Sequence, residues 1–457
     1  MVFSSITFLF LFLPITLLLS FFLKGKGLVW MLFVVSVLFY AFGEPSYVVL
    51  ILFSILLNYG IGRLIGREKH PKAWLTVGVV VNLGLLVFFK YFAFLMENLG
   101  ILFPAITAWE IPKITLPIGI SFYTFQALSY LVDVYRKEVQ VQKHFASFGM
   151  YITFFPQLIA GPIVRYIDIE EQLNTLKRSF PQIKSGVELF TIGLGKKVLL
   201  SNAFGLFFQT FQSTPQANGT LCNWAAILAY TLHIYFDFSG YSDMAIGLGR
   251  MFGFEFLQNF NYPYISKSIT DFWRRWHISL STWFLEYLYI PLGGNRKGKA
   301  RQVVNLFIVW LMTGLWHGAS WNFLLWGGYY ALLLVIEKNF LGKYMAKLPA
   351  FVQWACTFFA VMMGWTVFAF VDFNALTAFI KGLFTLAPLS KTAMSFVGYA
   401  PLFLVGFLFA LPIGKMVKRP LPKWVEALKP FAFIAILWLS ISALVSQSYN
   451  PFIYFRF

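Results

Sequence analysis

The chain has 457 residues, of which 59% are hydrophobic and only 12% are charged. An ordinary soluble domain carries about 25% charged residues, so a soluble enzyme, a nucleic-acid-binding domain and a disordered chain are all excluded. What remains is a polytopic integral membrane protein, and its long apolar runs predict the all-α class.

The net charge of +18 comes from 36 Lys and Arg residues against 18 Asp and Glu residues. The basic residues gather in short clusters between apolar runs, which is the pattern of cytoplasmic loops. Some of these clusters fit the head groups of anionic membrane lipid, and no nucleic-acid partner is predicted. Cys222 and Cys356 lie in different segments, so neither a disulfide framework nor a cysteine-based metal site is expected.

A helix needs about 20 apolar residues to cross a bilayer, and the chain offers a succession of such runs. No Lys or Arg precedes Lys24, so the first run is predicted to be a span and not a cleavable signal. Because the loops are short, we expect one integral domain over residues 1–457, with about 11 to 14 transmembrane or re-entrant helices. The candidate spans are Phe3–Leu23, Leu28–Phe42, Tyr47–Ile61, Trp74–Leu95, Leu116–Val132, Val187–Phe208, Trp224–Tyr235, Val303–Leu315, Phe323–Ile336, Val352–Phe370, Phe396–Ile413 and Phe431–Val445, with Phe148–Val164 and Ala375–Ala387 as ambiguous half-spans.

The basic clusters also predict the orientation. Lys24 and Lys26 follow the first span and are assigned to the cytoplasm, which puts the N-terminus outside. The same rule assigns the stretch Lys267–Arg301 to the cytoplasm and the tail, residues 446–457, to the outside. We therefore predict a multi-pass protein of the cell (inner or cytoplasmic) membrane with both termini extracytoplasmic.

The middle of the chain is irregular. Two prolines and a glycine interrupt Phe154–Arg165, so a straight helix is not expected. Irregular backbone at membrane depth survives only where protein or a water-filled cavity satisfies it, which predicts a re-entrant segment lining a cavity. Arg165–Lys184 fits an interfacial amphipathic helix, and Lys196 with Lys197 predicts that the next helix is broken or interfacial.

His317 is the first candidate for chemistry, because an ionisable residue beside an apolar run is costly and usually functional. It lies in TGLWHGASWNF, where the small residues are interpreted as room for a substrate chain and the aromatic residues as a barrier to water. A neutral imidazole there can take a proton from a hydroxyl as general base. The alternative is a core histidine that holds two helices together.

His277 is the second candidate and lies in the basic, amphipathic segment DFWRRWHISLS. Asp271, Arg274 and Arg275 can form an ion-pair network near the head groups. One interpretation is an interfacial helix with aromatic and arginine anchors. The other is the cytoplasmic mouth of a tunnel, where arginine and histidine meet an anionic acyl donor.

The stretch DFSGYSD places Asp237 and Asp243 in an apolar neighbourhood, where carboxylates need partners. His233 precedes Asp237 by one helical turn, so the two can pair on one face. We interpret these three residues as structural or orienting, with cation binding as the alternative. His, Asp and Glu are too sparse for a metal site, and none is predicted.

The C-terminal residues FIYFRF also allow two interpretations. They fit an aromatic anchor at the membrane interface. Alternatively, Tyr454 accepts an acyl group. A phenol has a pKa near 10, so its ester is activated, and a mobile terminus could carry that ester to an external acceptor.

Four segments, FFPQLIAGPIVR, FDFSGYSDMAIGLGRMF, TDFWRRWHISLSTWFLEYLYIPLGG and TGLWHGASWNF, together resemble the membrane-bound O-acyltransferase family. The most similar branch contains the bacterial alginate O-acetylation membrane protein and other polysaccharide-modifying relatives. The resemblance is densest over residues 116–337. It implies a ring of tilted helices around a basin that contains a tunnel.

The resemblance also implies roles. His317 matches the family's catalytic histidine, and His277 matches its second signature histidine. It implies acetyl-CoA or another cytoplasmic acyl donor as a substrate, with no bound cofactor, and an extracellular or periplasmic SGNH-type O-acetyltransferase that acts on an exported polysaccharide. The residues expected to bind the donor are Arg274, Arg275, Trp276 and Asn322.

Two details qualify the resemblance. The branch usually has Arg-Asp where this chain has Leu285-Glu286, and the lost arginine leaves the donor's identity open. The related D-alanylation system of lipoteichoic acid uses a small peptide with an aromatic, tyrosine-containing end, and the tail around Tyr454 is similar to that end.

Three other functions are weighed against acetyl transfer. D-alanyl transfer to teichoic acid is one, although WFLEYLYIPLGGNR favours the acetylation branch. A proton-coupled secondary transporter could use Asp237, Asp243 and His233, but the paired repeats typical of transporters are not found. A structural scaffold without chemistry is the third.

Overall fold

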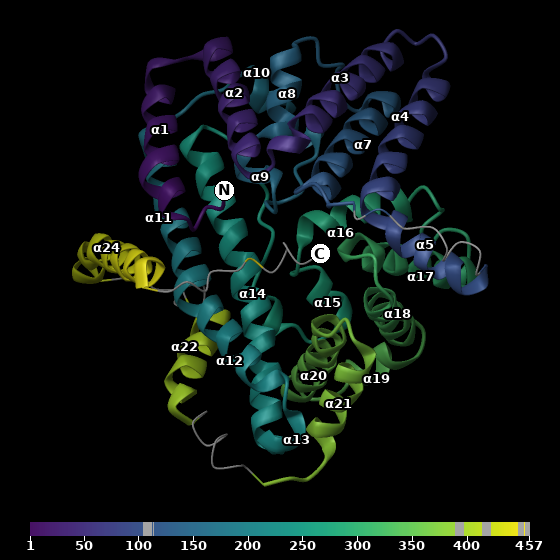
Figure 1. Cartoon of the computed structure of the whole chain (residues 1–457), viewed down its shortest axis with the longest axis vertical. Coiled ribbons are helices and arrows are strands. Elements are labelled where there is room, and N and C mark those ends of the chain that lie inside the picture. The colour runs from purple at the N-terminus through teal and green to yellow at the C-terminus, as the bar shows by residue number, and fades with distance from the viewer. Residues whose placement is uncertain (104–111, 113, 389–396, 414–421, 447–451, 453–457) are drawn as a thin grey trace. The chain divides into compact units, whose positions relative to one another are not determined.

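The computed structural model describes residues 1–103, 112, 114–388, 397–413, 422–446 and 452. Within these residues every regular element is a helix (Figure 1), which confirms the all-α class. Five helical stretches are long and apolar enough to cross a membrane: Gly25–Gly43, Pro45–Ile65, Pro71–Leu102, Ala350–Ala369 and Lys423–Ser446. The larger number of spans expected from the sequence stays a prediction.

The contacts divide the chain into two compact units. Unit 1 comprises Met1–Phe190, Met244–Gln258 and Leu285–Tyr287. Unit 2 comprises Thr191–Asp243, Asn259–Phe284 and Leu288–Phe457. The sequence-based expectation of a single integral domain stays a prediction.

Unit 1 is a set of apolar helices packed through small residues. The helices α3, α4 and α7 lie side by side (Figure 1), with Gly62 of α3 against the ring of Tyr130 and Gly78 of α4 against Leu131. Its helices are η1 (Phe8–Phe12), α1 (Leu13–Phe22), α2 (Gly25–Gly43), η2 (Pro45–Tyr47), α3 (Val48–Ile65), α4 (Pro71–Leu86), η3 (Val87–Tyr91), α5 (Phe92–Leu102), α7 (Ile120–Arg136), α8 (Phe145–Thr153), α9 (Phe155–Leu158), α10 (Tyr166–Asn174) and most of α11 (Phe180–Gly195).

The irregular segment of unit 1 begins where the prolines predicted it. Helix α8 ends at Thr153, the four-residue α9 ends at Leu158, and residues 159–165 form no helix. The single amphipathic helix expected over Arg165–Lys184 is wrong, because residues 175–179 separate α10 from α11. This backbone is buried, and Tyr151 holds it by donating a hydrogen bond to the carbonyl of Val164 (3.1 Å).

Unit 2 is built around the 32-residue helix α14 (Thr220–Met251), whose residues up to Asp243 belong to this unit. The helix runs unbroken through the polar stretch DFSGYSD. The other helices of unit 2 are η4 (Lys196–Ser201), α12 (Asn202–Gln212), α13 (Pro215–Asn218), η5 (Pro263–Ile265), α15 (Ile269–Trp273), α16 (Ile278–Phe284), the last two residues of η6 (Leu285–Tyr289), α17 (Lys299–His317), α18 (Trp321–Ile336), η7 (Glu337–Leu341), α19 (Gly342–Met345), α20 (Ala350–Ala369), α21 (Phe373–Phe384), α22 (Ala400–Ala410) and α24 (Lys423–Ser446).

Helices α17 and α18 form a close hairpin, and its packing corrects one expectation. A Cβ atom added to Gly314 would lie 2.2 Å from the carbonyl oxygen of Phe323, and one added to Gly318 would lie 2.3 Å from the Phe323 ring. The small residues around His317 therefore admit Phe323 and the neighbouring helix. The interpretation of these glycines as space for a substrate chain is wrong.

Candidate functional site

His317 is the last residue of α17. The helix ends there because Gly318 is extended, with φ of −174°. The imidazole is 6% exposed and is enclosed by aromatic rings, with centroids 5.1 Å away for Trp316, 5.1 Å for Trp326 and 5.2 Å for Phe368. The enclosing rings keep bulk water away from the His317 imidazole, which can exchange a proton near neutral pH.

His277 lies in the turn between α15 and α16, outside the five candidate spans, with a positive φ of 46°. Its side chain is 1% exposed and is therefore enclosed by protein. Its Nδ1 lies 3.3 Å from Oδ1 of Asn259, and its ring meets that of Phe238 at 4.5 Å. Burial, with the proximity of His317 as a smaller cause, holds the pKa of His277 well below its ordinary value, so the ring is neutral near neutral pH.

Trp316 connects the two histidines. Its ring centroid lies 5.8 Å from that of His277 and 5.1 Å from that of His317. The two residues are 40 positions apart in the sequence, and the structure brings them together inside unit 2. Two water-excluded imidazoles on one aromatic residue form a site suited to proton transfer without competing hydrolysis.

The four residues expected to bind the donor differ in their exposure and in their partners. Arg274 is exposed, and Arg275 forms an ion pair with Asp271 (Nε to Oδ1, 2.9 Å), one pair of the network that the sequence suggested. Trp276 is buried and packs on Trp365 at 4.7 Å, so it belongs to the aromatic core. The structure buries the fourth, Asn322, completely.

The two carboxylates of α14, the buried Asp237 and the partly buried Asp243, have lysine partners that the sequence does not indicate. Lys197 pairs with Asp237 at 2.5 Å, with both side chains almost fully buried, and Lys196 pairs with Asp243 at 2.7 Å. Both lysines lie on η4, a π-helical segment in line with α11 and α12. The interruption predicted at these lysines is therefore a widened turn, and the lysines compensate the acidic residues of α14.

His233 joins this network through a hydroxyl group. Ser201 Oγ lies 2.9 Å from His233 Nδ1 and donates a hydrogen bond to Asp237 Oδ1 at 3.1 Å. The expected association of His233 with Asp237 thus involves a serine contributed by η4. Each member is buried and hydrogen-bonded, which fits the structural interpretation of these residues.

The tail is described at one position, Phe452. Its side chain is 4% exposed, and its ring stacks on that of Tyr241 of α14 at 4.5 Å. Tyr454, the candidate acyl acceptor, lies outside the described residues. The sequence does not reveal the contact between Phe452 and Tyr241, because the segments FIYFRF and GYSD are far apart and share no pattern that pairs them.

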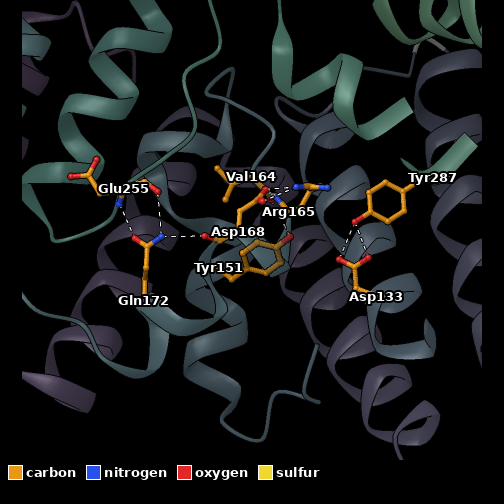
Figure 2. A network of polar contacts seen from close by, with 8 residues as sticks. All are labelled: Asp133, Tyr151, Val164, Arg165, Asp168, Gln172, Glu255 and Tyr287. Carbon is orange, nitrogen blue, oxygen red and sulfur yellow. Dashed lines mark hydrogen bonds and ion pairs between the residues drawn. The ribbon is translucent and has the colours of Figure 1, made fainter. Parts of the chain in front are cut away.

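Unit 1 contains a second polar network, shown in Figure 2. Arg165 forms a bidentate pair with Asp168 (2.8 and 3.0 Å), and Tyr287 donates to the carboxylate of Asp133 at 2.8 Å. Arg136 donates to the carbonyl of Glu286 at 3.1 Å. The segment Leu285–Tyr287, where the chain departs from the branch pattern, is therefore anchored on α7 by Asp133 and Arg136.

A family model described as MBOAT, membrane-bound O-acyltransferase family, matches residues 73–377. That range is well over half of the chain and contains both histidines. The chain belongs to the membrane-bound O-acyltransferase family. It is therefore a multi-pass membrane protein and an O-acyltransferase.

Comparison with named relatives indicates which branch of the membrane-bound O-acyltransferases this chain resembles. The chain is 37% identical to the "Probable alginate O-acetylase AlgI" of Pseudomonas putida, over 100% of both chains. It is 33% identical to the "Peptidoglycan O-acetyltransferase" of Helicobacter pylori, over 87% of this chain and 83% of that protein. The "Teichoic acid D-alanyltransferase" of Bacillus subtilis is 30% identical over 50% of this chain and 60% of its own. These matches confirm the resemblance to the alginate O-acetylation branch.

Proposed function

We propose that this chain takes acetyl groups from cytoplasmic acetyl-CoA and passes them across the membrane for O-acetylation of an exported polysaccharide. Two relatives that match most or all of the chain are named for acetyl transfer to alginate and peptidoglycan, whereas the D-alanyltransferase matches half of it. The observation that carries the chemistry is the pair His277 and His317, both buried and both in contact with the ring of Trp316.

In this proposal His317 is the general base. It removes the proton from an attacking hydroxyl while that oxygen bonds to the carbonyl carbon of the donor thioester. The carbon–sulfur bond then breaks, and the proton passes from the imidazolium to the departing thiolate. His277 stays neutral and orients the reacting groups. Arg274 and Arg275 attract the anionic donor from the cytoplasmic side.

The acceptor hydroxyl is that of Tyr454, which then hands the acetyl group to an external SGNH-type transferase. Support comes from the burial of Phe452 on Tyr241. Tyr241 lies one turn beyond Phe238, the residue that contacts His277.

The deciding experiment uses the purified full chain in lipid vesicles with radiolabelled acetyl-CoA and a tyrosine-containing acceptor peptide. We expect His317→Ala to lower transfer by about 10²- to 10⁴-fold, the usual contribution of general-base catalysis, at an unchanged amount of folded protein. A fully active His317→Ala variant contradicts the assignment. Transfer only from a D-alanyl carrier thioester identifies the D-alanylation alternative. Solute uptake without any acylated product identifies the transporter.

Transfer of the acetyl group from the cytoplasm to the outside also requires the predicted orientation of the chain in the membrane. In a Cys222→Ala, Cys356→Ala background, Ile453→Cys should react with a membrane-impermeant thiol reagent in intact cells, and Lys299→Cys should not. The opposite pattern overturns the direction of acyl transfer.

A further inference from the structure

Asn322, the second residue of α18, is a fully buried amide. Within the described part of the chain neither its Oδ1 nor its Nδ2 has a hydrogen-bond partner. Buried polar side chains are nearly always hydrogen-bonded, so an amide left unsatisfied at both ends calls for a reason beyond folding. It offers two N–H donors and one acceptor to a guest molecule.

Trp326 supplies a second donor on the same face of the helix. It lies four residues after Asn322, which places the two side chains one turn apart on α18. Its ring is fully buried and lies 5.1 Å from the imidazole of His317. Its Nε1–H also has no hydrogen-bond partner among the described residues. Two unsatisfied N–H donors therefore lie one turn apart on α18, and the ring of one of them, Trp326, packs beside the proposed base.

We propose that Asn322 Nδ2 and Trp326 Nε1 donate hydrogen bonds to the oxyanion that forms from the carbonyl oxygen of the donor thioester, and so stabilise the negative charge of the transition state. This inference rests on the proposed function. As the acceptor oxygen bonds to the carbonyl carbon, the carbonyl π electrons move onto the oxygen. That oxygen becomes an oxyanion, which accepts both N–H bonds. Its electrons return when the carbon–sulfur bond breaks, and the proton held by His317 goes to the thiolate.

Asn305 of α17 is a natural comparison. It is the same residue type and equally buried, but its Nδ2 donates to the carbonyl of Gly294 at 2.9 Å and so fastens the loop that precedes α17. The Oδ1 of Asn305 is also without a partner among the described residues, so the two asparagines differ in the amide nitrogen, which is used in Asn305 and unsatisfied in Asn322. The contrast gives a matched pair of variants, Asn322→Leu and Asn305→Leu, with similar changes in volume and polarity.

The test measures acetyl transfer and thermal unfolding of the full chain in vesicles. Asn322→Leu should lower kcat by about 10²- to 10³-fold, the usual effect of removing one oxyanion donor, and leave the KM for acetyl-CoA unchanged because ground-state binding is kept. Its unfolding midpoint should stay the same or rise, since an unsatisfied buried amide is replaced by an apolar side chain. Asn305→Leu should lower the midpoint and leave kcat per folded molecule unchanged.

Trp326→Phe is the second variant, because it removes the N–H and keeps an aromatic ring. Trp326→Phe should lower kcat by at least about tenfold. If Asn322→Leu does not accumulate in the membrane, the kcat of Trp326→Phe alone tests the proposal. Unchanged kcat in the variants of Asn322 and Trp326, with an active wild type, overturns the inference. An Asn322→Leu chain with a lowered midpoint and normal kcat also overturns it. A wild type without transfer instead refutes the proposed function.

Discussion

The ring of Phe452 stacks on the ring of Tyr241, with centroids 4.5 Å apart and ring planes at 25°. Phe452 is buried against protein, so at this position the tail is not an anchor facing lipid. Tyr241 and Phe238 lie on successive turns of α14, and Phe238 contacts His277. One helix therefore contacts both Phe452 and His277.

This stack predicts that tail position and acyl transfer are coupled. Phe452→Ala should lower acetylation of Tyr454 by about 10²-fold, since a displacement of about 1 Å of a reacting group has that effect. Mass spectrometry of the C-terminal fragment measures the acetyl group. Tyr241→Phe keeps the ring and should transfer normally, and Tyr241→Leu should behave like Phe452→Ala. Normal acetylation in Phe452→Ala would mean that the stack does not position the tail.

The buried ion pair of Lys197 and Asp237 predicts an asymmetric effect on stability. Lys197→Met leaves a buried carboxylate without its charge partner, which costs about 3–5 kcal/mol. Thermal unfolding in detergent should show a much lower midpoint. The double variant Lys197→Met, Asp237→Leu should recover most of the loss because no unpaired charge remains. If the double variant is as unstable as the single one, the pair is not the source of the effect.

The sequence predicted the broken backbone at Phe154–Arg165 and singled out His277 and His317 as candidates, because proline geometry and an ionisable side chain beside an apolar run are local properties. It did not predict that His277 is buried. It also predicted that Asp237 needs a partner. It did not identify Lys197, because the π-turn that directs this lysine toward α14 has no recognisable composition. The glycines around His317 predict a substrate channel but serve helix packing, because a pattern of small residues does not distinguish the two.

The buried, neutral His277 predicts a dependence of stability on pH. Its pKa is depressed in the folded state, so below about pH 6.5 the unfolded chain binds a proton that the folded chain does not. The free energy of unfolding should therefore fall with decreasing pH, by up to about 1.4 kcal/mol per pH unit from this residue. Unfolding midpoints measured across this range should vary less in His277→Gln. The exposed His70 is the control, and His70→Gln should keep the wild-type dependence.

The aromatic enclosure of His317 predicts a preference for short acyl groups. Phe368 of α20 lies 5.2 Å from His317 and 5.3 Å from Trp326, and Phe323 packs on it at 5.0 Å. Because Phe323 also fills the space beside Gly314 and Gly318, a longer acyl chain beside the base must displace a ring. Phe368→Ala removes one ring and leaves a cavity, so transfer from butyryl-CoA should rise relative to acetyl-CoA.

The control for Phe368→Ala must be a variant that loses as much stability without changing the surroundings of His317. Phe379 of α21 is fully buried and packs on Phe370 at 4.9 Å, so Phe379→Ala makes a cavity elsewhere in unit 2. Both variants should lose about 3–5 kcal/mol, but only Phe368→Ala should change the ratio of the two transfer rates. If Phe368→Ala leaves the ratio of butyryl to acetyl transfer unchanged, the cavity beside His317 has no effect on selectivity. Another part of the chain then limits the length of the acyl group.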